Sequence, residues 1–282
     1  MLFPDNIGEY LSLDETEMSN GELYTILTNK AAKGKKGTIV AMIEGVKSDT
    51  IISIINKIPL SKRNKVKEVT VDMANNMNLA IRSSFFKSEI VIDRFHVQKL
   101  ASEAVQDIRI KYRWEAIDKE NLEIEKSRNK NSIYRPLILS NGDTIKQLLA
   151  RSRFLLFKPE TRWTNTQLKR SKILFKYYPD IERAYKLSQK LSYIYENNTN
   201  KIVAMTKFAQ WYKDVENSGF KAFNTVARSF HLHYDKILNY FNNRSTNASA
   251  ESFNAKIKRF RAEFRGVKDL EFFLFRLTKI FA

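Results

Sequence analysis

Three carboxylates are the side chains of this sequence whose types and positions could do chemistry: Asp14, Asp72 and Glu251. Asp14 and Asp72 each follow a short apolar-rich run that predicts a β-strand, whereas Glu251 lies in a segment with helical periodicity. Carboxylate oxygens are the hard ligands that Mg²⁺ prefers, and two such ions can stabilise both the attacking and the leaving oxygen of a phosphoryl transfer. For each aspartate taken alone, a turn or a helix cap after its strand is the alternative.

The segment that carries Glu251 is expected to be an amphipathic helix with its cap at Asn247 or Ser249. The core-facing stripe at helical spacing consists of Phe253, Ile257, Phe260 and Phe264. A second face consists of Glu251, Asn254, Lys258 and Arg261. One carboxylate followed by cations suits a metal ion with phosphates beside it, and a surface helix whose charges only face water is the alternative.

Positive charge is in excess over the whole chain, which has 49 Lys and Arg residues against 31 Asp and Glu residues. The net charge of +18 favours an anionic polymer or an acidic membrane surface as partner. The residues expected to contact nucleic-acid phosphates near Glu251 are Lys256, Lys258, Arg259, Arg261, Arg265 and Lys268. Trp163, between two predicted helices, would stack on an unpaired base or pack inside a helical hairpin.

Cysteine is absent, which excludes disulfides, cysteine nucleophiles and thiolate metal sites. Because the only histidines are His96, His231 and His233, a structural zinc site is not expected. His231 and His233 are expected at the surface or in packing. The N-terminus lacks the pattern of a signal peptide, and no apolar run approaches the ~20 residues of a membrane span. We therefore expect a soluble cytoplasmic protein with no membrane partner.

Five strands and two helices are expected in the first third of the chain. The helices are Thr50–Ile58 and Asn76–Phe86, and the strands are Tyr10–Leu13, Leu23–Asn29, Thr38–Glu44, Lys67–Asp72 and Glu89–Asp93. The first three strands predict an antiparallel meander, and the helix–strand alternation after them predicts an α/β sheet with helices against its faces. Ligand chemistry in such sheets gathers at the strand ends.

Helical periodicity begins near residue 97 and continues to residue 243. The expected helices are Gln98–Lys126, Thr144–Phe157, Thr164–Tyr177, Pro179–Glu196, Asn200–Asn217 and Phe220–Tyr240. We therefore predict three segments. Residues 1–97 form the first part of the α/β domain, residues 98–243 form an all-helical insertion, and the helices of residues 244–282 complete the α/β domain.

Several blocks of the sequence resemble the signature segments of bacterial insertion-sequence DDE transposases, most of all those of the family called ISL-three. The blocks are Leu13–Glu15, Val69–Met73, Ile92–Val97, Arg153–Glu160, Thr246–Lys258, Phe264–Gly266 and Phe272–Arg276. They extend over nearly the whole chain. The Asp-Arg-Phe-His block at residues 93–96 and the Asn-containing Glu helix are the most specific of them.

The resemblance implies a ribonuclease H-like α/β fold, in which a mixed sheet with flanking helices is interrupted by a large all-helical insertion. It implies Asp14, Asp72 and Glu251 as catalytic ligands of two Mg²⁺ or Mn²⁺ ions, with no zinc. The implied activity is hydrolysis at transposon ends, followed by attack of the freed 3′-hydroxyl on target DNA. The implied state is a homodimer on DNA, in the bacterial cytoplasm and at the nucleoid.

Asp93 and His96 occupy the place of an Asp-x-x-His motif in related transposases. Together with Asn254 they are expected to support the metal ligands or to contact DNA near the site. The alternative is that Asp93 caps the helix starting at Arg94 and that His96 packs. Family members usually carry an N-terminal zinc-binding and helix-turn-helix region that this sequence does not show, so that region is expected to be missing, trimmed away or supplied by a separate DNA-recognition polypeptide.

Two other functions remain open on the sequence alone. One is a ribonuclease H-like nuclease or resolvase that cuts strands without joining them. The other is an inactive transposon relic that only binds nucleic acid. A role at a membrane surface fits the charge but not the aspartates that follow the strands.

Overall fold

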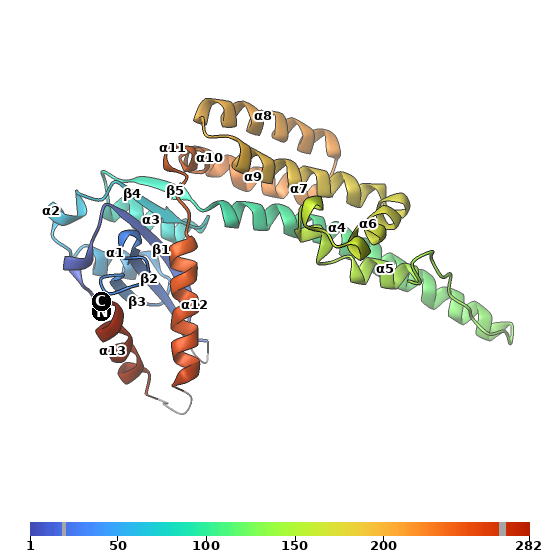
Figure 1. The fold of residues 1–282 in the computed structure, drawn as a ribbon, viewed down its shortest axis with the longest axis horizontal. Helices are drawn as coiled ribbons and strands as arrows, with labels where there is room; N and C mark the ends of the chain where they lie inside the picture. The colour runs from blue at the N-terminus through green and yellow to red at the C-terminus, as the bar shows by residue number, and fades with distance from the viewer. Residues whose placement is uncertain (19–20, 265–268) are drawn as a thin grey trace. The chain divides into compact units, whose positions relative to one another are not determined.

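The computed structural model describes residues 1–18, 21–264 and 269–282, which form two compact units (Figure 1). The first unit contains residues 1–96, 199–201 and 233–282, and the second contains residues 97–198 and 202–232. The expected α/β class, with a mixed sheet and a large helical insertion, is confirmed. The domain boundaries at residues 97 and 243 stay predictions.

A five-stranded sheet forms the centre of the first unit, with the strand order β3-β2-β1-β4-β5. Its strands are β1 (Tyr10–Glu17), β2 (Leu23–Asn29), β3 (Ile39–Glu44), β4 (Glu68–Val71) and β5 (Glu89–Ile92). The first three are antiparallel, as the meander pattern predicted, whereas β4 is parallel to both β1 and β5. The carboxyl ends of these parallel strands therefore lie at one edge of the sheet.

Strand β1 is longer than the sequence suggested, because it continues past Leu13 to Glu17. Asp14 consequently lies within the strand, opposite Ile26 of β2, rather than after its end. Cross-strand pairing explains the difference: Thr16 is buried opposite Tyr24, and the N–H of Met18 donates to Glu22 O to close the hairpin.

Seven helices of the first unit lie in the described part of the chain. They are α1 (Ser48–Ile55), α2 (Leu60–Arg63), α3 (Asn75–Ser84), α10 (Tyr234–Leu238), α11 (Tyr240–Asn243), α12 (Ala248–Glu263) and α13 (Leu270–Phe281). Helix α12 runs along the sheet and contacts β1 (Figure 1). Its Phe253 and Ile257 are buried with Ile26 and Met42 of the sheet and Phe273 of α13, which confirms the predicted apolar stripe.

The second unit is built from helices, as predicted. They are α4 (Arg94–Asn129), α5 (Ile145–Arg151), α6 (Asn165–Tyr177), α7 (Pro179–Asn197), α8 (Lys201–Ser218) and α9 (Lys221–Leu232). Of these, α4 and α8 each start within the first unit. The helix predicted over Phe220–Tyr240 is instead divided at His233, whose backbone leaves the helical region at φ −118° and ψ 18°. Within the described ranges, no helix has the length and apolar character needed to cross a bilayer.

Candidate active site

Asp14 is held from two sides. Asn254 of α12 donates from Nδ2 to Asp14 Oδ2 over 2.8 Å, and the backbone N–H of Glu15 donates to Asp14 Oδ1 over 2.9 Å. Burial of Phe253 and Ile257 fixes the rotation of α12 about its axis, because these residues flank Asn254 on the same helix. The packing of α12 therefore decides which side chain faces Asp14.

Asp72 follows β4 directly and is held in the turn that starts α3. Its Oδ1 accepts the N–H of Ala74 over 2.8 Å, so the carboxylate satisfies a free donor at the start of that helix. The Asn78 amide donates to Ala74 O over 2.8 Å and lies 3.4 Å from Asp72 O. Lys236 of α10 in turn donates to Asn78 Oδ1 over 2.6 Å, which ties this turn to a second helix.

Asp93 follows β5 and is fully buried. Its Oδ1 accepts the backbone N–H of Asn247 over 3.1 Å, and its Oδ2 lies 3.4 Å from His96 Nδ1 in an ion pair. Asn247 is the N-cap residue of α12, but its own side chain makes no capping hydrogen bond. The carboxylate at the end of β5 therefore serves the N-terminus of the helix that carries Glu251.

The charges of these groups act on one another. Burial, together with the negative charges of Asp72 and Glu251, raises the pKa of Asp14 to about 6, although the Glu15 N–H and His96 oppose the shift. Burial and the Asp93 carboxylate raise the pKa of Glu251. The pKa of His96 is raised chiefly by Asp93 and further by Asp72 and Asp14. Carboxylates from β1, β4, β5 and α12 thus surround one imidazole.

The donor set fits a divalent cation in kind, because its carboxylates offer the oxygen ligands that Mg²⁺ and Mn²⁺ accept. The raised pKa values of Asp14 and Glu251 reflect a desolvated negative charge that a cation would stabilise. Within residues 1–18, 21–264 and 269–282, however, no three His, Asp or Glu side chains lie close enough together to hold a metal ion. The carboxylates interact electrostatically but lie too far apart to bind the same ion. They would have to move closer together to share one ion.

The basic residues predicted to bind DNA on α12 have different surroundings. Lys256 donates to Gly34 O over 3.1 Å, and Arg259 pairs with Glu263 at 3.3 Å. The guanidinium of Arg261 lies 4.9 Å from the centre of the Phe273 ring. Lys258 is exposed. Arg265 and Lys268 lie outside the described residues.

Trp163 belongs to the second unit and packs there. Its Nε1 donates to Leu155 O over 2.8 Å, and its ring centre lies 5.4 Å from that of Tyr185 and 6.2 Å from that of Phe175. These contacts match the packing alternative. Stacking of Trp163 on a base stays a prediction.

Two features of the site were missed in the sequence. Lys30, at the end of β2, pairs with the buried Glu68 of β4 at 3.3 Å and also contacts the hydroxyl of Thr70. The side-chain amide of Asn247 is fully buried, with no hydrogen-bond partner for either polar atom among the described residues. The sequence offered two signals for these features: Lys30 directly follows a predicted strand, and Asn247 lies four residues before Glu251. Each pattern is also common in ordinary turns and caps.

Comparisons with known proteins identify a family for this chain. A family model described as Transposase matches residues 11–277. The Transposase for insertion sequence element IS1001 from Bordetella parapertussis is 23% identical over 277 residues, which cover 97% of this chain and 61% of that protein. The chain thus spans about three fifths of the length of this relative. No solved structure matches the chain. Because the family model covers nearly the whole chain, the protein belongs to the ISL-three family of transposases.

Proposed function

We propose that this chain is a DDE-type transposase catalytic domain with a ribonuclease H-like fold. It cleaves DNA strands at transposon ends and transfers them to target DNA, in a reaction that depends on divalent metal ions. One observation carries the proposal: Asp14, Asp72 and Glu251 come from three separate elements into a region where Asp14 feels the negative charge of the other two. Like charges are brought together at the cost of stability where a cation is to be bound.

Each residue of the site has a role in this proposal. Asp14, Asp72 and Glu251 hold two Mg²⁺ or Mn²⁺ ions, which when bound stabilise the charge of a phosphoryl transfer. Asn254 orients the Asp14 carboxylate through its hydrogen bond. Asp93 fixes the start of α12, and His96 balances part of the negative charge around it. We propose no role for zinc, because the chain contains no cysteine and only three histidines, and the candidate ligands are carboxylate oxygens.

The reaction has two steps with the same chemistry. Water attacks a phosphorus atom at the transposon end, the bond to the 3′-oxygen breaks, and that oxygen leaves as a 3′-hydroxyl. This hydroxyl then attacks a phosphorus atom of target DNA, displaces the next 3′-oxygen and joins the two strands. Lys258 and its basic neighbours on α12 contact the phosphates of the bound DNA. We further propose a homodimer on paired ends, which a separate DNA-recognition polypeptide can assist.

The test is cleavage and joining of DNA carrying transposon ends by wild type and by Glu251→Gln, with Mg²⁺ or Mn²⁺. The substitution keeps the shape of the side chain and removes a negative ligand. We expect cleavage and joining by wild type and neither by the variant, with unchanged circular dichroism. The matched control is Glu263→Gln, which removes an exposed carboxylate from the same helix and should retain activity.

Three results would contradict the proposed function or part of it. Full cleavage by Glu251→Gln would remove Glu251 from the site. Cleavage without joining by wild type would favour a nuclease. Binding of DNA without cleavage, under all metal conditions and with the DNA-recognition partner added, would favour a relic that only binds DNA.

A further inference from the structure

Helix α6 lies in the most one-sided charge environment of the second unit. Between residues 151 and 177 the sequence contains eight Lys and Arg residues and a single acidic residue, Glu160. Helix α6 itself, Asn165–Tyr177, has no Asp or Glu. Clustered like charges repel one another, so acidic partners within the unit or an external anion would stabilise such a run.

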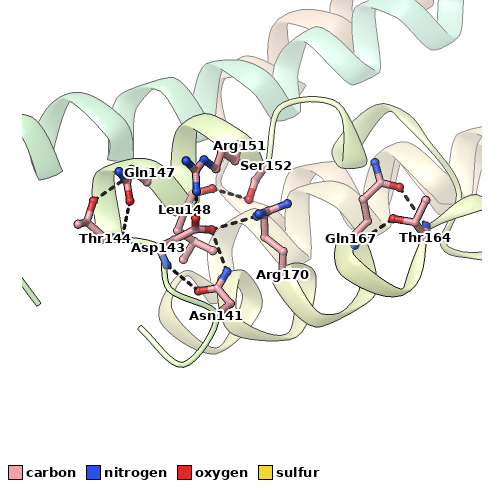
Figure 2. Close-up of polar contacts among 10 residues, drawn as sticks. All are labelled: Asn141, Asp143, Thr144, Gln147, Leu148, Arg151, Ser152, Thr164, Gln167 and Arg170. Carbon is pink, nitrogen blue, oxygen red and sulfur yellow. Dashed lines mark hydrogen bonds and ion pairs between the residues drawn. The ribbon is translucent and has the colours of Figure 1, made fainter. Parts of the chain in front are cut away.

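Two of these cations are used inside the unit. Asp143, only 1% exposed, accepts from Arg151 and, over 3.1 Å, from Arg170 of α6, and Asn141 donates to it over 2.8 Å (Figure 2). Although burial opposes ionisation, the two guanidinium groups hold the pKa of Asp143 below its ordinary value. Arg151 and Arg170 therefore have an internal structural role and are not free for a ligand.

The start of α6 is fixed by a capping box. Thr164 accepts the N–H of Gln167 over 3.2 Å, and the Gln167 side chain accepts the N–H of Thr164 over 3.1 Å (Figure 2). Thr144 and Gln147 make the same pair of bonds at the start of α5. These contacts and the Asp143 ion pairs make α5 and α6 a preorganised platform, so the outward face of α6 keeps one orientation within the unit.

That outward face carries three lysines. Lys169, Lys172 and Lys176 follow one another at three and four residues, so they form one stripe, and all three are exposed. The buried Ser171 and Leu174 lie on the opposite face. Within the part of the chain that the structure describes, none of the three lysines has an ion-pair or hydrogen-bond partner.

The neighbouring helix α7 shows that this lack of partners is not general. Its Arg183 pairs with Asp180 at 2.7 Å, and its Lys186 pairs with Glu182 at 2.6 Å. Its Lys190 pairs with Asp214 of α8. Cations on α7 are thus neutralised within the unit, whereas those on the outer face of α6 are not.

We propose that the stripe Lys169–Lys172–Lys176 of α6 binds the phosphate backbone of duplex DNA without reading its sequence. The dimensions are compatible: the seven residue steps from Lys169 to Lys176 rise by about 10 Å, and three consecutive phosphates of one strand span about 7 Å along the duplex axis. Flexible lysine side chains can bridge this difference. A membrane fits less well, because an interfacial helix must offer its apolar face to the lipid and α6 buries that face in the unit.

This inference rests on the proposed function for its choice of DNA, but its test does not require cleavage. The binding of full-length protein to a short fluorescent duplex is measured by anisotropy between about 50 and 200 mM salt. The variant is Lys169→Gln/Lys172→Gln/Lys176→Gln. The matched control is Lys207→Gln/Lys213→Gln/Lys221→Gln, which removes the same charge from exposed lysines of α8 and α9 in the same unit.

We expect the α6 variant to bind duplexes of any sequence more weakly. The slope of log affinity against log salt should become shallower by about 3, which is about 1 for each phosphate that the variant no longer neutralises. The control should keep the wild-type slope. Equal slopes for the α6 variant and wild type would overturn the proposal, as would equal losses in the α6 variant and the control.

Two further probes decide the ligand. Loss of binding to anionic phospholipid vesicles or to single-stranded RNA, with duplex DNA binding intact, would overturn the assignment to duplex DNA. If Glu251→Gln still cleaves DNA, the proposed function fails but the α6 result stands, because binding and cleavage are measured separately. The two proposals can thus fail independently.

Discussion

The Asp93 carboxylate at the end of β5 accepts a hydrogen bond of 3.1 Å from the backbone N–H of Asn247, 154 residues later in the chain. Asn247 is the N-cap residue of α12, whose first turn carries Glu251. Asp93, at the end of a sheet strand, therefore fixes the start of the helix that carries Glu251. Asp14 and Asp72 lie in or directly after strands of the same sheet. The alternative reading of the sequence was that Asp93 caps α4, the helix that follows it directly. The hydrogen bond of Asp93 instead goes to the start of α12.

Asp93→Ala should loosen the start of α12. The buried N–H of Asn247 loses its acceptor, so we expect a loss of about 1–3 kcal/mol in the free energy of unfolding and faster hydrogen exchange of the amides at 247–251. Mass spectrometry of deuterated peptides measures this. Asp269→Ala is the control, because Asp269 caps α13 through the N–H of Phe272 and should destabilise the protein without changing exchange at α12. Unchanged exchange at 247–251 in Asp93→Ala would contradict the role given to Asp93.

Asn254→Asp should change how cleavage depends on pH. A carboxylate placed beside Asp14 raises the pKa of Asp14 above its present value of about 6, so Asp14 stays protonated to higher pH. The acidic limb of the pH profile should move to higher pH. It should move less in Asn254→Ala, which removes a hydrogen bond but adds no charge and should lower activity about 10- to 100-fold. The control is Asn242→Asp, because Asn242 also donates to a carboxylate, that of Glu89 over 3.0 Å. An acidic limb that does not move would show that Asn254 does not act through Asp14.

Asp14→Asn should stabilise the metal-free protein at neutral pH. The folded-state pKa of about 6 lies above the unfolded value of 3.8, so the folded state favours the protonated carboxyl. The contribution of this group to stability is therefore full below pH 3.8 and is lost as pH rises through 6. Since one pKa unit corresponds to about 1.4 kcal/mol, the gain for Asn is on the order of 3 kcal/mol at pH 8 and small at pH 4.

Thermal unfolding in EDTA at both pH values measures that difference. Adding Mg²⁺ should raise the unfolding temperature of wild type and leave that of Asp14→Asn unchanged, which tests metal binding without an activity assay. Asp14→Asn with equal stability gains at pH 4 and pH 8 would show that the pKa of Asp14 is not raised. A Mg²⁺ effect of the same size in both proteins would remove Asp14 from the metal ligands.

Local patterns were sufficient for much of the fold. Alternation and β-branched content located β2 within one residue, and the periodicity of α12 predicted its buried face from Phe253 and Ile257. Asp72 and Asp93 were placed correctly after β4 and β5, because apolar runs that end in a polar residue mark the end of a buried strand. Such signals depend on near neighbours in the chain and can be read without tertiary structure.

The remaining features depend on distant partners. Strand β1 continues past Asp14 because Thr16 pairs with Tyr24 across the hairpin, and no residue next to Asp14 indicates this. The bond from Asn254 to Asp14 joins residues 240 positions apart, and the ion pair of Lys30 with Glu68 joins different strands. The sequence supplied the candidate residues of the site, whereas their hydrogen-bond partners required the fold.

The division of the first unit in the sequence affects how the protein matures on the ribosome. All five strands are synthesised before residue 97, but α12 and α13 follow only after the second unit. At 5–20 residues per second, synthesis of the intervening residues 97–232 takes roughly 7–27 s. During that time the sheet lacks the helices that cover Ile26 and Met42, and the nascent chain exposes an apolar face suited to a chaperone. Because Glu251 follows the second unit in the sequence, a chain released by a stalled ribosome before residue 251 would lack this carboxylate.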